Sequence, residues 1–122
     1  MDTSQYADAW QTAVEGFNRG DLEPLSRLLA DGCEFNSSMG PVGTSRDEIV
    51  ARMREGLDGG WTSHNLLGVH AAGEFLTSCY RNDFSDGSSF FGAGVLRFGP
   101  DGKIAEIRSL EAADQIARAS GT

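Results

Sequence analysis

The chain has 122 residues and is acidic, with 18 Asp and Glu against 10 Lys and Arg and a formal net charge of −8. A chain of this length folds as one domain around one core. Binding to nucleic acid favours clustered Lys and Arg, and a membrane span needs ~20 apolar residues in a row. The sequence has neither of these, nor a basic start followed by an apolar run. It therefore predicts a cytoplasmic protein that binds neither nucleic acid nor membrane.

Two helices are expected at the start of the chain. Apolar residues recur at helical spacing from Tyr6 to Phe17, and Gly20 stops this first helix. Asp21 caps a second, shorter helix that carries leucines on one face and ends at residues 31–32.

A strand, a loop and a third helix should follow. Residues 33–38 have the pattern of a short strand, and residues 39–44 contain Pro and two Gly, which is typical of a loop. Ser45 and Glu48 form a capping box. The third helix therefore begins at Ser45 and stops at residues 59–60.

The second half of the chain reads as strands. Tight turns rich in Gly, Asp and Pro separate the last three apolar-rich segments, which favours an antiparallel meander. The expected strands cover residues 61–70, 75–84, 88–98 and 103–110. A sheet of this size needs a cover for one face, which the helices supply. The predicted fold class is therefore α+β, with three helices packed on a curved, mainly antiparallel sheet.

The two cysteines, Cys33 and Cys79, lie in strand-like surroundings and lack metal-ligand spacing. We expect buried thiols, with a disulfide between them as the alternative. Neither a metal nor a cofactor is expected.

Several short motifs, in this order of elements, resemble the nuclear transport factor 2-like superfamily, and in particular its small bacterial SnoaL-like and ketosteroid isomerase-like members. The motifs are Gly20-Asp21, Leu29-Ala30-Asp31, Gly43-x-x-Arg46, Val95-Leu96-Arg97-Phe98 and Asp101-Gly102-Lys103-Ile104. The resemblance covers residues 6–111. It implies one SnoaL-like domain, a cone-shaped α+β barrel with its pocket on the concave face, and a core of residues 4–111 followed by a tail, 112–122.

The resemblance also bears on the catalytic residues. The Asp base, Tyr and protonated Asp of ketosteroid isomerases match Ser37, Ala13 and Gly94, which cannot perform that reaction. The Arg-x-Asp pair of limonene epoxide hydrolases is similar to Arg81-Asn82-Asp83. The second catalytic Asp of that pattern falls on Ser109. Its water-holding Tyr and Asn fall on Phe35 and Ser37.

Three residues are the expected catalytic group. Arg81 and Asp83 share one face of a strand, which the resemblance implies is concave, and His64 on the neighbouring strand should reach the same pocket. Asp83 and His64 would then exchange a proton while Arg81 stabilises a negatively charged oxygen. The alternatives are a solvated Arg81–Asp83 pair and a His64 without a catalytic role.

The remaining pocket wall is expected to be apolar. Gly92 and Gly94 lie on one face of a strand and would leave room for a flat ring, although a bulge or a bend is the alternative. The other expected substrate-binding residues are Phe17, Phe35, Ser37, Trp61, Phe90, Leu96 and Ser109, with Glu111 as a further candidate at the mouth.

The expected function is that of a cofactor-independent isomerase, cyclase or epoxide-opening enzyme acting on a small hydrophobic substrate. The alternative is a protein of the same fold that binds such a molecule without turning it over. If Arg81 and Asp83 point inward, an apolar outer patch remains, which predicts a homodimer. That patch would comprise Tyr80, Phe84, Phe91, Ala93 and Val95.

Overall fold

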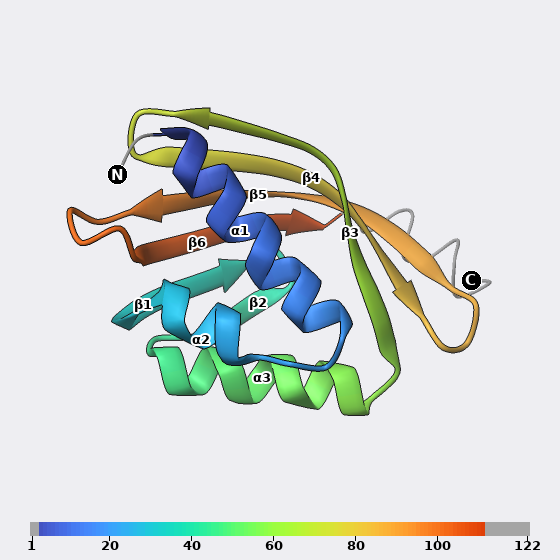
Figure 1. The fold of residues 1–122 in the computed structure, drawn as a ribbon. Coiled ribbons are helices and arrows are strands. Elements are labelled where there is room, and N and C mark those ends of the chain that lie inside the picture. Colours follow the sequence, from blue (N-terminus) through green and yellow to red (C-terminus); the bar gives the residue numbers. More distant parts are fainter. Residues whose placement is uncertain (1–2, 112–122) are drawn as a thin grey trace.

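A computed structural model describes residues 3–111 as three helices and six strands (Figure 1). In chain order these are α1 (Thr3–Asn18), α2 (Glu23–Leu28), β1 (Leu29–Ser37), β2 (Gly40–Gly43), α3 (Arg46–Asp58), β3 (Trp61–Ala72), β4 (Phe75–Phe84), β5 (Ser89–Phe98) and β6 (Ile104–Glu111). The predicted α+β class is confirmed. The predicted tail, 112–122, lies outside the described residues.

The six strands form one curved sheet in the order β2-β1-β6-β5-β4-β3, and its two edges do not close on each other. Every pair is antiparallel except β1 with β6, which run parallel. Helix α1 lies across the concave side and packs along β3, whereas α3 packs against β1 and β2 (Figure 1). The helices therefore cover the concave face of the sheet.

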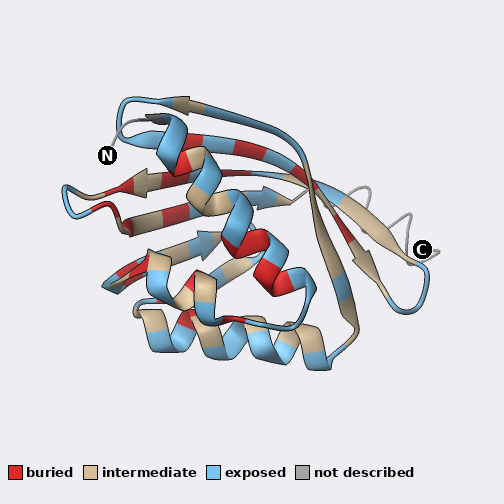
Figure 2. Ribbon diagram, viewed as in Figure 1, coloured by how far each residue is buried: buried red, intermediate tan, exposed pale blue. Residues whose placement is uncertain are grey.

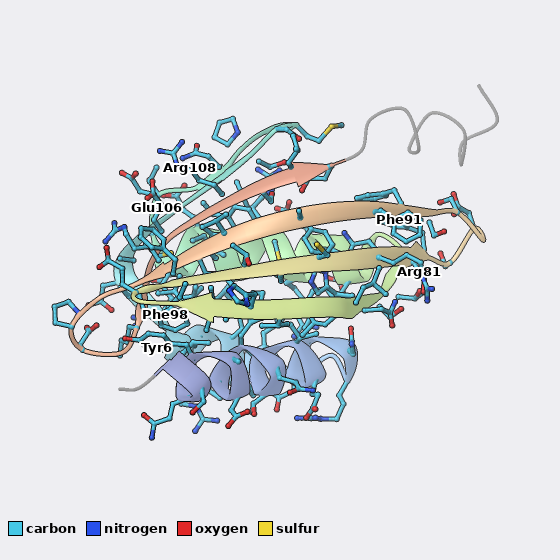
Figure 3. The ribbon with its side chains drawn as sticks, turned by 90° about the horizontal axis from the view of Figure 1, so that it is seen from above. Tyr6, Arg81, Phe91, Phe98, Glu106 and Arg108 are labelled. Carbon is cyan, nitrogen blue, oxygen red and sulfur yellow. The ribbon has the colours of Figure 1, made fainter. Side chains whose placement is uncertain are left out.

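The core lies between α1 and the concave face. Buried positions alternate along β4, as expected for a strand with one covered face (Figure 2). At one end Tyr6 of α1 stacks on Phe98 of β5 with ring centroids 4.0 Å apart (Figure 3). Leu29, Leu76 and Ile104 are fully buried. Packed side chains therefore fill this end of the concave face.

Local signals in the sequence placed most helix ends correctly. Ser45 is the N-cap of α3, and its hydroxyl accepts a hydrogen bond from the Glu48 backbone N–H at 3.2 Å. The second helix, however, ends at Leu28 rather than at residues 31–32, because Leu29 already has extended backbone angles and begins β1. A short run rich in leucine is compatible both with a helix and with the start of a buried strand. The apolar pattern alone therefore does not locate the boundary between α2 and β1.

The expected loop at residues 39–44 contains a short strand, β2. Pro41 lacks an N–H, which argues against a central strand but is tolerated at the edge of a sheet. Strand β2 is such an edge. Pro41 and the two glycines are therefore compatible with a short edge strand.

Both cysteines are free, Cys33 buried and Cys79 exposed on the outer face of β4. The prediction of a buried thiol is thus confirmed for Cys33 and wrong for Cys79. Burial, followed by the nearby carboxylates of Glu106 and Glu34, raises the pKa of Cys33 to about 11.

Within residues 3–111, none of the helices is long and apolar enough to cross a membrane. The same residues contain no group of three or more His, Cys, Asp or Glu side chains that could hold a metal ion.

Candidate functional site

The alternation of side chains along strand β4 determines which of its residues reach the concave face. Ser78, Tyr80 and Asn82 point inward and are buried, whereas Arg81 and Asp83 alternate with them and point outward. Asp83 accepts hydrogen bonds from Arg81 Nε at 2.9 Å and from Asn65 Nδ2 at 2.9 Å. The expectation that Arg81 and Asp83 line the pocket is therefore wrong.

This error is a shift of one residue along the strand, which moves every side chain to the opposite face. Arg81 pairs with Phe91 of β5, and the two side chains lie together on the outer surface (Figure 3). The Arg81 hydrogen bond lowers the pKa of Asp83, so the pair is an ionised surface pair. Phe91, Ala93 and Val95 are exposed as expected for the outer patch, but Tyr80 and Phe84 point inward.

Two adjoining cavities lie on the concave side, lined by residues of the described range 3–111. The inner one has a volume of about 100 Å³ and is walled mostly by apolar side chains of α1 and the sheet. The outer one, about 360 Å³, lies towards β2 and α3. Five residues line both cavities: Phe35, Met53, Trp61, Asn82 and Glu111.

Most of the residues expected to bind substrate do line these cavities. Phe17, Phe35, Trp61, His64, Gly94, Leu96 and Ser109 line the inner cavity. Ser37 and Phe90 line the outer one. The neighbouring Phe84 stacks on Phe90 with ring centroids 5.4 Å apart.

Gly92 has a different role from the expected one. It pairs with Tyr80, and a Cβ at this position would come within 2.6 Å of the tyrosine ring. The space that Gly92 leaves is therefore filled by the protein's own Tyr80, with Gly94 also in contact range of that ring. No bulge interrupts the pairing of β4 with β5.

His64 occupies the inner cavity with a fixed tautomer. Its Nδ1 lies 2.6 Å from Oδ1 of Asn82, and the indole Nε1 of Trp61 donates to the same oxygen at 3.1 Å. Because an indole N–H can only donate, the Asn82 amide pairs with both groups when its oxygen faces them, which is its orientation in the structure. His64 therefore carries its proton on Nδ1, and Nε2 presents a lone pair.

The surroundings of His64 keep the imidazole neutral. Burial lowers its pKa from the ordinary value of 6.5, and the hydrogen bond with Asn82 opposes this only in part. The ring lies against Tyr80 with centroids 4.4 Å apart. The backbone N–H of His64 donates to Asn18 Oδ1 at 2.8 Å, which ties β3 to the end of α1.

Glu111 forms the polar boundary between the two cavities. Ser37 donates to Oε2 at 2.6 Å, Ser109 to Oε1 at 2.8 Å and Tyr80 to Oε1 at 3.2 Å, with Ser38 as a further donor. Burial by itself raises the pKa of Glu111, but these hydrogen bonds outweigh it and hold the pKa below its ordinary value. Burial, and then the charge of Glu111, raises the pKa of Tyr80.

Four polar residues of the inner cavity were not expected from the sequence. These are Trp10, Ser78, Tyr80 and Asn82. A signal for Tyr80 was present, because two glycines in one strand accommodate a large ring on the strand beside it. Asn82 and Trp10 carry no such signal, since their roles depend on contacts between distant parts of the chain.

Comparisons with known proteins are consistent with this architecture. A model of the SnoaL-like domain matches residues 10–107. No curated protein gives a significant match.

Solved structures share the fold at low sequence identity. An LEH-like epoxide hydrolase of M. tuberculosis has a TM-score of 0.83 and 13% identity, covering 96% of this chain and 90% of that one. AclR of Streptomyces galilaeus, a proposed hydroxylase, has a TM-score of 0.81 and 16% identity over 99% of each chain. A proposed ketosteroid isomerase of Kribbella flavida has a TM-score of 0.79 and 16% identity, over 91% of this chain and 80% of that one. At such identities the likeness shows the fold alone.

Proposed function

The chain belongs to the SnoaL-like domain family, and we propose that it is a cofactor-independent enzyme that moves a proton on a small hydrophobic substrate, with His64 as general base. One observation carries the proposal. The Nδ1 of His64 is held 2.6 Å from the Asn82 oxygen, while Nε2 is buried in a mostly apolar cavity without a protein partner. A neutral imidazole in such a place is a base that water does not compete for.

The surrounding groups support an enolate reaction. When Nε2 takes a proton from a carbon next to a carbonyl group, the imidazolium keeps its Nδ1–H on Asn82 and is stabilised there. Isomerisation and cyclisation both pass through such an enolate.

Epoxide opening receives less support from this cavity, because it needs an acid for the leaving oxygen. The carboxyl group among the described lining residues is Glu111, whose lowered pKa keeps it ionised. The Tyr80 hydroxyl already donates to Glu111, and its pKa is raised. Neither group is therefore a ready proton donor at neutral pH.

A binding protein is the second candidate, and Asn82 is the observation that favours it. A catalytic imidazole is commonly oriented by a carboxylate, which stabilises the imidazolium more strongly than an amide oxygen does. The nearest candidate from the sequence, Asp83, is on the outer face.

Exchange of the α-protons of cyclohexanone for deuterium, followed by NMR in D₂O, separates the two functions. His64→Gln should lower the exchange rate by roughly 10²- to 10⁴-fold, the usual contribution of a general base. Asp83→Asn is the matched control, since it alters a carboxylate one strand position from Asn82 but outside the cavity, and it should leave the rate unchanged.

Because the pKa of His64 is lowered, the rate should hold below pH 6.5 and fall only on further acidification through that pKa. If the wild-type protein catalyses no measurable exchange, the proposed enzymatic function is wrong and the binding function is favoured.

A further inference from the structure

Two buried side-chain nitrogens among the described residues have no hydrogen-bond partner, Nε1 of Trp10 and Nε2 of His64. Both residues line the inner cavity. Buried polar groups are nearly always paired, and an unpaired one destabilises the fold. Two unpaired nitrogens in residues that line one cavity point to a ligand that pairs with both.

The two nitrogens have opposite hydrogen-bonding roles. Nε1 of Trp10 can only donate, and Nε2 of His64 can only accept, because its proton is on Nδ1. They also come from different elements, α1 and β3, which pack against each other. The other tryptophan, Trp61, gives the contrast, since its Nε1 already donates to the Ser63 carbonyl oxygen and to Asn82.

Charge and size limit the ligand further. No Lys or Arg is found among the described residues that line the inner cavity, and the ionised Glu111 is. A carboxylate or phosphate group would therefore be repelled. The volume of about 100 Å³ is somewhat below the ~150 Å³ of an apolar cavity that holds benzene. It accommodates a short chain or part of a small ring, with the rest of the ligand extending into the outer cavity.

We propose that the inner cavity binds a small neutral α-hydroxyketone, whose carbonyl oxygen accepts from Trp10 Nε1 and whose hydroxyl donates to His64 Nε2. The proposal rests on the proposed function and names its substrate class. The carbon that bears the hydroxyl also bears the acidic C–H. Once the hydroxyl hydrogen turns from Nε2 to the neighbouring oxygen, the lone pair of Nε2 takes the C–H proton. The C–H electron pair forms the C=C bond of an enediolate, and the charge passes to the oxygen that faces Trp10.

Return of the proton completes an isomerisation. The imidazolium protonates the former carbonyl carbon, and the proton of the hydroxyl group passes to the neighbouring oxygen. The carbonyl and hydroxyl groups have then exchanged places, with all atoms and electrons accounted for. The reaction uses no oxidant and no reductant.

NMR of the ¹⁵N-labelled full chain tests the ligand class, with 2-hydroxycyclohexanone as the probe. The chain has two tryptophans, so two indole N–H signals are expected, and Trp10→Phe assigns them. Titration should move the Trp10 signal downfield with saturation and the Trp61 signal much less, because only the Trp10 N–H gains an acceptor. Cyclohexanone and cyclohexanol, which each keep one of the two groups, should bind about 5-fold more weakly. Cyclohexanecarboxylate should not bind.

Trp10→Phe keeps the aromatic ring and removes the donor. Its affinity for 2-hydroxycyclohexanone should fall about 5-fold, and that for cyclohexanol should not change. If wild-type protein binds hydroxyketone, ketone and alcohol equally, or binds none of them, the ligand class is wrong, whatever the folding of the variant. Deuterium exchange that is lost in His64→Gln would then still support the general base. If the wild-type protein prefers the hydroxyketone but catalyses no deuterium exchange, the ligand class is supported and the proposed enzymatic function is wrong.

Discussion

Both faces of strand β4 carry polar residues, but the two faces differ in burial and in charge. On the inner face, Tyr80 and Asn82 are buried, uncharged and hydrogen-bonded to Glu111 and His64. On the outer face, Arg81 and Asp83 form an ion pair with each other in contact with water. Charged residues are the more obvious catalytic candidates in a sequence. On β4, however, the neutral residues line the cavity. Burial of neutral groups in a network is less costly than burial of charges, which selects Asn and Tyr for the interior.

The largest difference between the two faces should appear in stability. Leu76→Ala removes a fully buried side chain and should lower the free energy of unfolding by about 2–5 kcal/mol. Thr77→Ala, one residue further on the exposed face, should change it by less than ~0.5 kcal/mol. Urea denaturation followed by circular dichroism measures both. Equal losses would show that the inner and outer faces of β4 are wrongly assigned.

A smaller effect is expected where the inner network meets the mouth of the cavity. Glu111→Gln weakens the hydrogen bonds from Ser37, Ser109 and Tyr80 and turns one acceptor oxygen into a donor. Because the group is only partly buried, the expected loss is about 1–2 kcal/mol. Glu106→Gln is the control outside the cavities, since Glu106 pairs with Arg97 and Arg108 and lines neither cavity (Figure 3). It should cost less than ~1 kcal/mol. Losses in the reverse order in urea denaturation would contradict this account of Glu111.

The outer face should matter for assembly rather than for the fold. Phe75, Phe91, Val95 and Leu110 expose apolar side chains on β4, β5 and β6, and such a patch favours a homodimer. Light scattering should give about twice the chain mass of 13.0 kDa. Val95→Glu should give the monomer without loss of stability, whereas Met39→Glu, at the exposed β1–β2 turn, should remain dimeric. A wild-type monomer at micromolar concentration would rule out this interface.

The sequence predicted the fold well because its signals are local. The capping box of Ser45 and Glu48, the stop at Gly20 and the turns between the last strands each involve neighbours in the chain. The candidate site was predicted less well. Alternation shows which residues of β4 share a face, but it does not show which face is covered, because both sets mix apolar and polar residues. Which face is covered depends on contacts between strands, such as the packing of the Tyr80 ring against Gly92.

The central claim is that His64 is a neutral base with its proton on Nδ1 and a free lone pair on Nε2. ¹⁵N NMR of the imidazole ring tests it directly, and His70, on the exposed part of β3, serves as the internal reference. At pH 7 the account predicts a protonated Nδ1, an unprotonated Nε2 and a pKa for His64 below 6.5, because burial disfavours the charged form. In His64, a proton on Nε2, or a pKa above 6.5, would contradict it.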